Sequence, residues 1–158
     1  KATKEFGTSL KEQLTAAVET GGPLAAIKVC KAVADQFAAD ISHKYGLTIR
    51  RTALRVRNDG NTPDPFESQT LERFVKDIAA GKDAASLEHS VVVTTAPGTL
   101  SRSKKGLPTA AEPCLACRGP DVAADVRERL RKLYPNDQAI GFKAGELRGA
   151  FSVSVDAR

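Results

Sequence analysis

The chain has 158 residues, of which 41% are hydrophobic, so it is long enough to form one domain with its own core. Its net charge of +5 favours acidic partners, but the cations alternate with acidic residues on predicted helices, and no basic stripe carries interleaved aromatic residues. Nucleic-acid binding is therefore not expected. No apolar run reaches the length of a membrane span, and three cysteines are too few for a disulfide framework.

Two helices are predicted at the start of the chain. The first covers 8–22, with Thr8 or Ser9 as its cap and a Gly-Gly pair at its end. The second runs from Pro23, a residue tolerated in a first helical turn, to Gly46. Cys30 lies on the apolar face of this second helix, which is formed by Leu24, Ile27, Val33, Phe37 and Ile41.

The middle of the chain alternates strands, turns and one more helix. Residues 47–57 alternate apolar and polar side chains, which predicts a strand with Arg51, Arg55 and Arg57 on one face. A turn cluster follows, and residues 66–81 are typical of a third helix that ends at a glycine.

The second half supplies the remaining strands. Residues 89–96 and 98–107 predict a hairpin across residues 96–98, and a cysteine loop comes next. Asp121 can cap a helix over 122–134, and a strand over 145–156 closes the chain. This order predicts a single α+β domain over 1–158, with helices packed on one side of an antiparallel sheet.

The cysteine loop, EPCLACRGP at 112–120, is the strongest functional signal. Cys114 and Cys117 have the spacing that attaches haem in c-type cytochromes, but Arg118 follows where such proteins carry histidine. Three other uses of this spacing stay open. A zinc site lacks a second close pair of ligands, a redox dithiol favours a helix start, and a structural disulfide is the plainest reading.

The surroundings of this loop resemble a family of periplasmic c-type haem proteins with a PAS-like fold. The segment over 112–155 is similar to their pattern CLxCHG, helix, YPxDxAxGxxxGxxRGAFSV, and AIKVC at 26–30 resembles a helix of that family. RRTALRVRNDGNTPDPFE at 50–67 resembles a third segment, so the resemblance covers residues 23 to 155.

The resemblance implies a haem c held covalently by Cys114 and Cys117, with Cys30 as an axial iron ligand. Arg118 departs from the pattern, because a guanidinium stays protonated and offers no lone pair to iron. This leaves five-coordinate iron with an open position. Arg118 would then pair with a haem propionate or stabilise a bound small ligand, and Arg51 and Arg57 are further candidate propionate partners.

Neither histidine is expected to replace the missing ligand. His43 lies thirteen residues after Cys30 on the same predicted helix, about 20 Å along its axis at 1.5 Å per residue. His89 begins a predicted strand, where a surface histidine is the commoner outcome.

The resemblance therefore predicts a haem-based gas or redox sensor, or an electron-transfer module, and not an enzyme. An exported, periplasmic form is expected, since c-type haem is attached there and the chain begins at Lys1 rather than Met. Its partners would be a small gas or redox ligand and an acidic redox or signalling protein. The alternative is a haem-free PAS-like module with a Cys114–Cys117 disulfide that binds another small molecule.

Overall fold

Four antiparallel strands form one sheet in the order β1-β4-β3-β2. The computed structural model describes residues 1–95 and 98–157. The last strand in the chain lies inside the sheet, between the first and the third. The C-terminal segment therefore joins the first strand to the central hairpin. In sheet order, the strands are β1 (Thr48–Thr52), β4 (Leu147–Ala157), β3 (Gly98–Pro108) and β2 (Glu88–Thr95).

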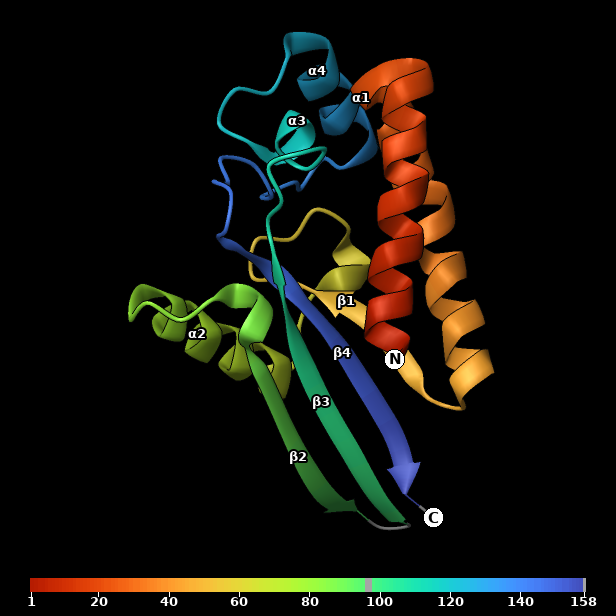
Figure 1. Ribbon diagram of the computed structural model, residues 1–158, viewed down its shortest axis with the longest axis vertical. Helices are drawn as coiled ribbons and strands as arrows, with labels where there is room; N and C mark the ends of the chain where they lie inside the picture. Colours follow the sequence, from red (N-terminus) through yellow and green to blue (C-terminus); the bar gives the residue numbers. More distant parts are fainter. Residues whose placement is uncertain (96–97, 158) are drawn as a thin grey trace.

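The helix α1 (Ala2–Tyr45) is broken at Gly22, whose φ of 67° and ψ of −169° are not helical. Glycine adopts such a positive φ without steric cost, and Pro23 then begins the second half. Figure 1 shows the two halves side by side and antiparallel. Their far ends meet where Glu5 accepts hydrogen bonds of 2.7 Å from Lys44 and 2.6 Å from the Tyr45 hydroxyl. The two predicted helices are thus confirmed.

The first half of α1 begins earlier than the sequence pattern indicates. The predicted caps, Thr8 and Ser9, lie inside the helix, which starts at Ala2. Ala2 and Phe6 are one turn apart, and both are buried against the sheet. The apolar stripe therefore extends the helix toward the N-terminus.

Helices cover both faces of the sheet, so the prediction of one covered face is wrong. On one face, Phe6 of α1 packs against Phe151 of β4 with ring centroids 5.4 Å apart. On the other face, Leu71 and Phe74 of α2 (Pro65–Ala79) pack against Ala150. Ala150 and Phe151 are neighbours in β4, and successive strand residues point to opposite faces. The predicted α+β class and antiparallel sheet are confirmed.

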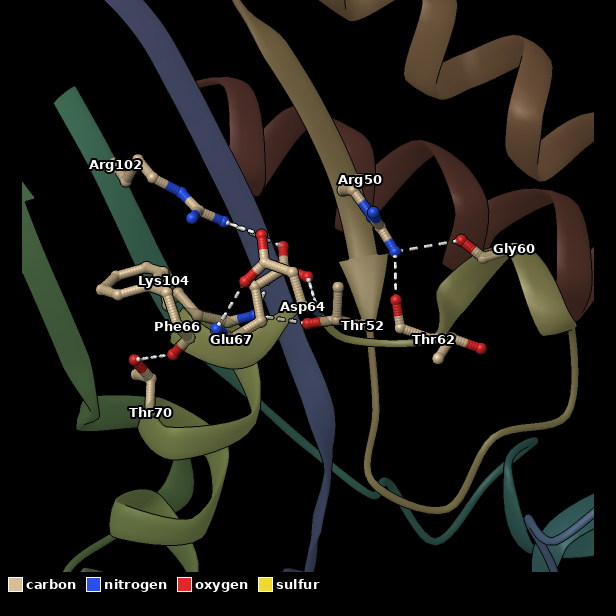
Figure 2. Close-up of polar contacts among 10 residues, drawn as sticks. All are labelled: Arg50, Thr52, Gly60, Thr62, Asp64, Phe66, Glu67, Thr70, Arg102 and Lys104. Atoms are coloured by element: carbon tan, nitrogen blue, oxygen red, sulfur yellow. Dashed lines mark hydrogen bonds and ion pairs between the residues drawn. The ribbon is translucent and has the colours of Figure 1, made fainter. Parts of the chain in front are cut away.

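A polar network fixes the N-terminus of α2 to the sheet (Figure 2). Asp64 and Glu67 form a reciprocal capping box at the start of this helix. Arg102 of β3 donates to Asp64, and the ammonium of Lys104 donates to the hydroxyl of Thr52 in β1. Lys104 and Glu67 are each 1% exposed, with a distance of 3.8 Å between the ammonium and the carboxylate. The network therefore ties three elements together beneath α2.

The strand predicted over 47–57 stops at Thr52, where its pairing with β4 ends. The amide of Ala53 donates to the carbonyl of Asn61 over 3.3 Å, so the chain turns into the short helix η1 (Asp59–Asn61). Residues 53–58 instead bind a loop far along the chain, for example through the hydrogen bond of 2.8 Å from the Gln138 amide to the Val56 carbonyl. The alternating pattern here reflects contacts with that loop.

The cysteine loop and the last helix lie together at one end of the molecule (Figure 1). The loop contains the four-residue helix α3 (Leu115–Arg118), which the sequence did not indicate. The helix α4 (Ala124–Leu133) starts after Ala123, so Asp121 is not its cap as predicted. In the described part of the chain, one side chain accepts a hydrogen bond from a backbone amide near this start. It is Asp125, which accepts from the amide of Val126.

The remaining elements agree with the predictions. The third predicted helix and the β2–β3 hairpin are present, whereas residues 96–97 of the predicted turn lie outside the described residues. A short helix η2 (Ala84–Ser86) precedes β2. Within the described residues, none of the helices is both long and apolar enough to cross a membrane.

Candidate functional site

One cavity brings all three cysteines together. Cys30 comes from the second half of α1, and Cys114 and Cys117 come from the α3 segment, more than eighty residues later. Each of these cysteines is partly buried and is a free thiol. The cavity is completed by β1 and the loop after it, by α4, and by the start of β4. Besides the cysteines and five arginines, its lining includes Leu14, Ala26, Ile27, Thr52, Ala53, Asn58, Asn61, Leu107, Pro113, Leu130, Tyr134 and Gly149.

The floor of the cavity is a close approach of two strands. A Cβ atom added to Gly149 would lie 2.3 Å from the carbonyl oxygen of Thr52, so only glycine fits at this position. This approach places the start of β4 directly beside the end of β1. The cationic side chains of Arg51 and Arg148 therefore reach the same cavity from neighbouring strands.

Arg57 holds the cysteine segment in place. Its guanidinium donates to the Cys117 carbonyl over 2.7 Å, to the Ala139 carbonyl over 2.9 Å and to the Asp137 carboxylate over 3.0 Å. The Arg57 and Asp137 side chains are only 8% and 11% exposed. The sequence predicts Arg57 as a haem-propionate partner. The structure gives it protein partners instead, although it still lines the cavity.

A second contact positions the CxxC segment against α1. The Cys117 thiol lies 4.0 Å from the Pro23 carbonyl, at the break in α1. Burial raises the pKa of the Cys117 thiol, and the charge of Arg57 opposes this rise. Ile27 of α1 and Val126 and Leu130 of α4 form the apolar cluster behind this thiol. The thiol is therefore held in its neutral form beside an apolar wall.

Three other arginines that line the cavity have no anionic partner. In the described part of the chain, the guanidinium groups of Arg51, Arg118 and Arg148 make no hydrogen bond or ion pair, and no Asp or Glu lines the cavity. Burial and the neighbouring Arg148 and Arg57 lower the pKa of Arg118 well below its usual value. Burial and Arg51 lower the pKa of Arg148 to about 10. The cavity is thus a partly buried cationic site.

The structure brings the predicted site residues together at this cavity. Cys30, Arg51, Arg57, Cys114, Cys117 and Arg118 all line it. Arg55, predicted on the same strand face, also lines it, but from the loop, with its guanidinium stacked 3.9 Å above the Phe142 ring. Arg148 and Tyr134 also line the cavity. The sequence does not predict them as site residues, because the local pattern places each in an ordinary strand or helix.

The histidines lie elsewhere. Neither His43 nor His89 lines the cavity, and the His89 ring stacks on Phe66 with centroids 5.9 Å apart. Across the described residues, no group of three His, Cys, Asp or Glu side chains is placed to hold a metal ion. A zinc site therefore has no ligand set here.

The donor set does fit a haem. Two thiols at the CxxC spacing can form thioether bonds, a third thiol on a facing helix can ligate iron, and unpaired guanidinium groups can bind propionates. In contrast, Arg118 offers no iron ligand. The chemistry of the lining therefore fits the porphyrin and one axial bond.

Comparison with known proteins identifies a family and a similar solved structure. No curated protein matches the chain. The structure is similar to the crystal structure of the cyanobacterial heme-protein Tll0287, with a TM-score of 0.67 and 25% sequence identity over 99% of this chain and 93% of that chain. The Tll0287-like family model matches residues 2–156. The chain belongs to the Tll0287-like family.

Proposed function

We propose that this protein binds a haem c, held by thioether bonds at Cys114 and Cys117 and ligated through iron by Cys30. The supporting observation is that these three thiols, from segments distant in sequence, line one cavity whose described lining holds no histidine and no carboxylate. Thioether attachment needs two thiols at the CxxC spacing, and iron accepts a cysteine thiolate. The similarity to a cyanobacterial heme-protein supports the haem-binding part of this proposal.

Different residues of this chain would contact different parts of the haem. The two thiols of α3 would fix one edge of the porphyrin, and Ile27 and Leu130 would cover its apolar surface. Arg51 and Arg148 would pair with the propionates, while Arg57 would hold the backbone of Cys117 in place. When bound, the haem would supply an iron that changes its charge and its ligands reversibly.

We further propose a sensing or electron-transfer role for this haem. In either role, a change at the iron would reach the second half of α1 through Cys30. Binding rather than catalysis is proposed, because the described lining offers neither the imidazole nor the carboxylate that most often serves as a general acid or base. Export to the periplasm and an acidic protein partner complete the proposal.

Absorption spectroscopy combined with intact mass tests the proposal directly. Protein co-produced with a c-type haem attachment system is expected to show a Soret band and, after denaturation, a mass equal to chain plus haem. The Cys114→Ser/Cys117→Ser variant should lose the added mass on denaturation. Colourless protein at the bare mass would contradict the proposal, and a further loss of two hydrogens would select a Cys114–Cys117 disulfide.

A further inference from the structure

Arg118 occupies a fixed position beside the cysteines, yet its charge has no partner. Its carbonyl accepts a hydrogen bond of 2.8 Å from the Phe142 amide, which holds the end of α3 against the loop before β4. Its guanidinium lines the cavity, where its charge interacts with the Cys30 thiol and with Arg148. Within the described chain, no carboxylate neutralises it.

The charges of the proposed haem do not fully neutralise the three unpaired guanidinium groups of the cavity. A haem carries two propionate carboxylates, and they can neutralise two of the three unpaired guanidinium groups of Arg51, Arg118 and Arg148. In the ferric state, the positive charge of the iron–porphyrin core is matched by the thiolate of Cys30. One positive charge therefore remains in a partly buried site, where an unpaired cation is costly.

The positions of the three arginines indicate which guanidinium group has no propionate partner. Arg51 and Arg148 extend from neighbouring strands, and the charge of Arg51 lowers the pKa of Arg148. Two adjacent guanidinium groups on one side suit the two propionates. Arg118 comes from the segment that carries the attachment thiols, and it lines the cavity together with Cys30, the thiol proposed to ligate iron.

We propose that Arg118 makes this cavity a binding site for a small monoatomic or linear anion at the haem iron, in preference to a neutral gas. The inference rests on the proposed function and names its ligand class. Because a guanidinium cannot ligate iron, the position stays open to an external ligand. An anion there would gain a charge-assisted hydrogen bond from Arg118, which a neutral diatomic molecule accepts only weakly.

Azide binding to the ferric holoprotein tests this inference. We expect the Arg118→Gln variant to bind azide about tenfold to a hundredfold more weakly than the wild type, the range given by one charge-assisted hydrogen bond. The Arg118→Lys variant should keep most of the affinity, because it keeps the charge. The matched control is Arg131→Gln, an exposed α4 residue that does not line this cavity and should leave azide affinity unchanged.

Two further readouts separate this role from a structural one. Carbon monoxide affinity of the ferrous protein should be nearly equal in wild type and Arg118→Gln, because the ligand is neutral. The midpoint potential of the variant should fall, since removal of a positive charge destabilises the ferrous state. Arg118→His, which supplies an imidazole, should abolish azide binding by occupying the iron.

The outcomes are distinct. Haem-loaded wild type that does not respond to azide, or equal azide affinity in wild type and Arg118→Gln, would overturn this inference and leave the haem function standing. If Arg118→Gln fails to fold or to retain haem, the comparison of wild type with Arg118→Lys decides, and loss of azide binding in the lysine variant would overturn it. Colourless protein would overturn both proposals.

Discussion

The guanidinium of Arg57 donates a hydrogen bond of 2.7 Å to the carbonyl oxygen of Cys117, sixty residues later in the chain. The same guanidinium pairs with Asp137 at 3.0 Å, and both side chains are largely buried. One arginine thus joins the loop after β1, the cysteine segment and the loop before β4.

The first prediction concerns Arg57→Met. Removal of one partner of a buried ion pair leaves the other charge unpaired, so we expect the free energy of unfolding to fall by about 3–5 kcal/mol. Urea denaturation at neutral pH measures this change. The exposed pair of Lys132 and Glu128 provides the control, since Lys132→Met should cost less than about 1 kcal/mol. Equal effects of the two substitutions would show that Arg57 does not hold the site together.

Local patterns in the sequence predicted most elements of this fold. Helical periodicity and the Gly-Pro break gave the two halves of α1, and β-branched alternation gave the hairpin strands. The strand over 47–57 was extended too far because the alternation continues past Thr52. There Arg55 and Arg57 line the cavity and the Val56 backbone bonds to a distant loop, and no local signal distinguishes this from sheet pairing.

The candidate site likewise contains residues that the sequence predicted and residues that it did not. Cys30, Cys114 and Cys117 were identified by their chemistry, spacing and resemblance, and the structure places them at one cavity. Arg148 was missed, because within β4 it reads as an ordinary polar strand residue. Its role depends on Gly149 bringing β4 against β1, which is a long-range contact that periodicity does not encode.

Lys104 provides a second prediction, on the dependence of stability on pH. It is buried beneath α2 and faces Glu67 and Asp64 at the start of that helix, with the cation Arg102 on its own strand and Arg50 on β1. Burial lowers the pKa of Lys104 from 10.5 to about 8 in the folded protein, and the two carboxylates oppose this shift. The folded state therefore releases the proton more readily than the unfolded state.

The sign follows from this difference. Below pH 8, Lys104 is charged in both states, and the folded state bears the full cost of burying the charge. Between pH 8 and 10.5 the unfolded state holds more protons, so stability rises with pH. At 1.36 kcal/mol per pKa unit, Lys104 should contribute a rise of about 2–3 kcal/mol over this window.

Urea denaturation at several pH values between 7 and 10.5 measures this contribution. The Lys104→Met/Glu67→Gln variant removes both charges while the glutamine keeps the capping box, and it should lack the rise attributed to Lys104. Lys105→Met is the matched control, because Lys105 lies on the opposite sheet face in a more exposed pair with Glu88. Parallel pH profiles for the wild type and the double variant would contradict the prediction.

The break in α1 gives a third prediction, with two glycines as a matched pair. Gly22 has a φ of 67° and a ψ of −169°, a region that is essentially restricted to glycine, so Gly22→Ala should cost about 1–3 kcal/mol of stability through backbone strain. Gly7 lies within the helix, and a Cβ atom there would make an ordinary contact of 3.5 Å with the Phe151 ring. Gly7→Ala should therefore stabilise the protein by up to about 1 kcal/mol. Thermal unfolding should show shifts of opposite sign, and a shared sign would refute this account of the break.

The fourth prediction separates haem attachment from iron ligation. Cys30 lies on α1, apart from the attachment segment, so Cys30→Ala should retain the covalent haem mass after denaturation. Its iron would lose the proposed thiolate, and the reduced protein with carbon monoxide should lose the thiolate-type Soret position that the wild type shows. Cys117→Ala is the reciprocal control, because it removes one thioether bond and leaves the Cys30 thiol in place. If Cys30→Ala and wild type give the same spectrum in both redox states, another group ligates the iron and the cavity thiol of α1 is only a packing residue.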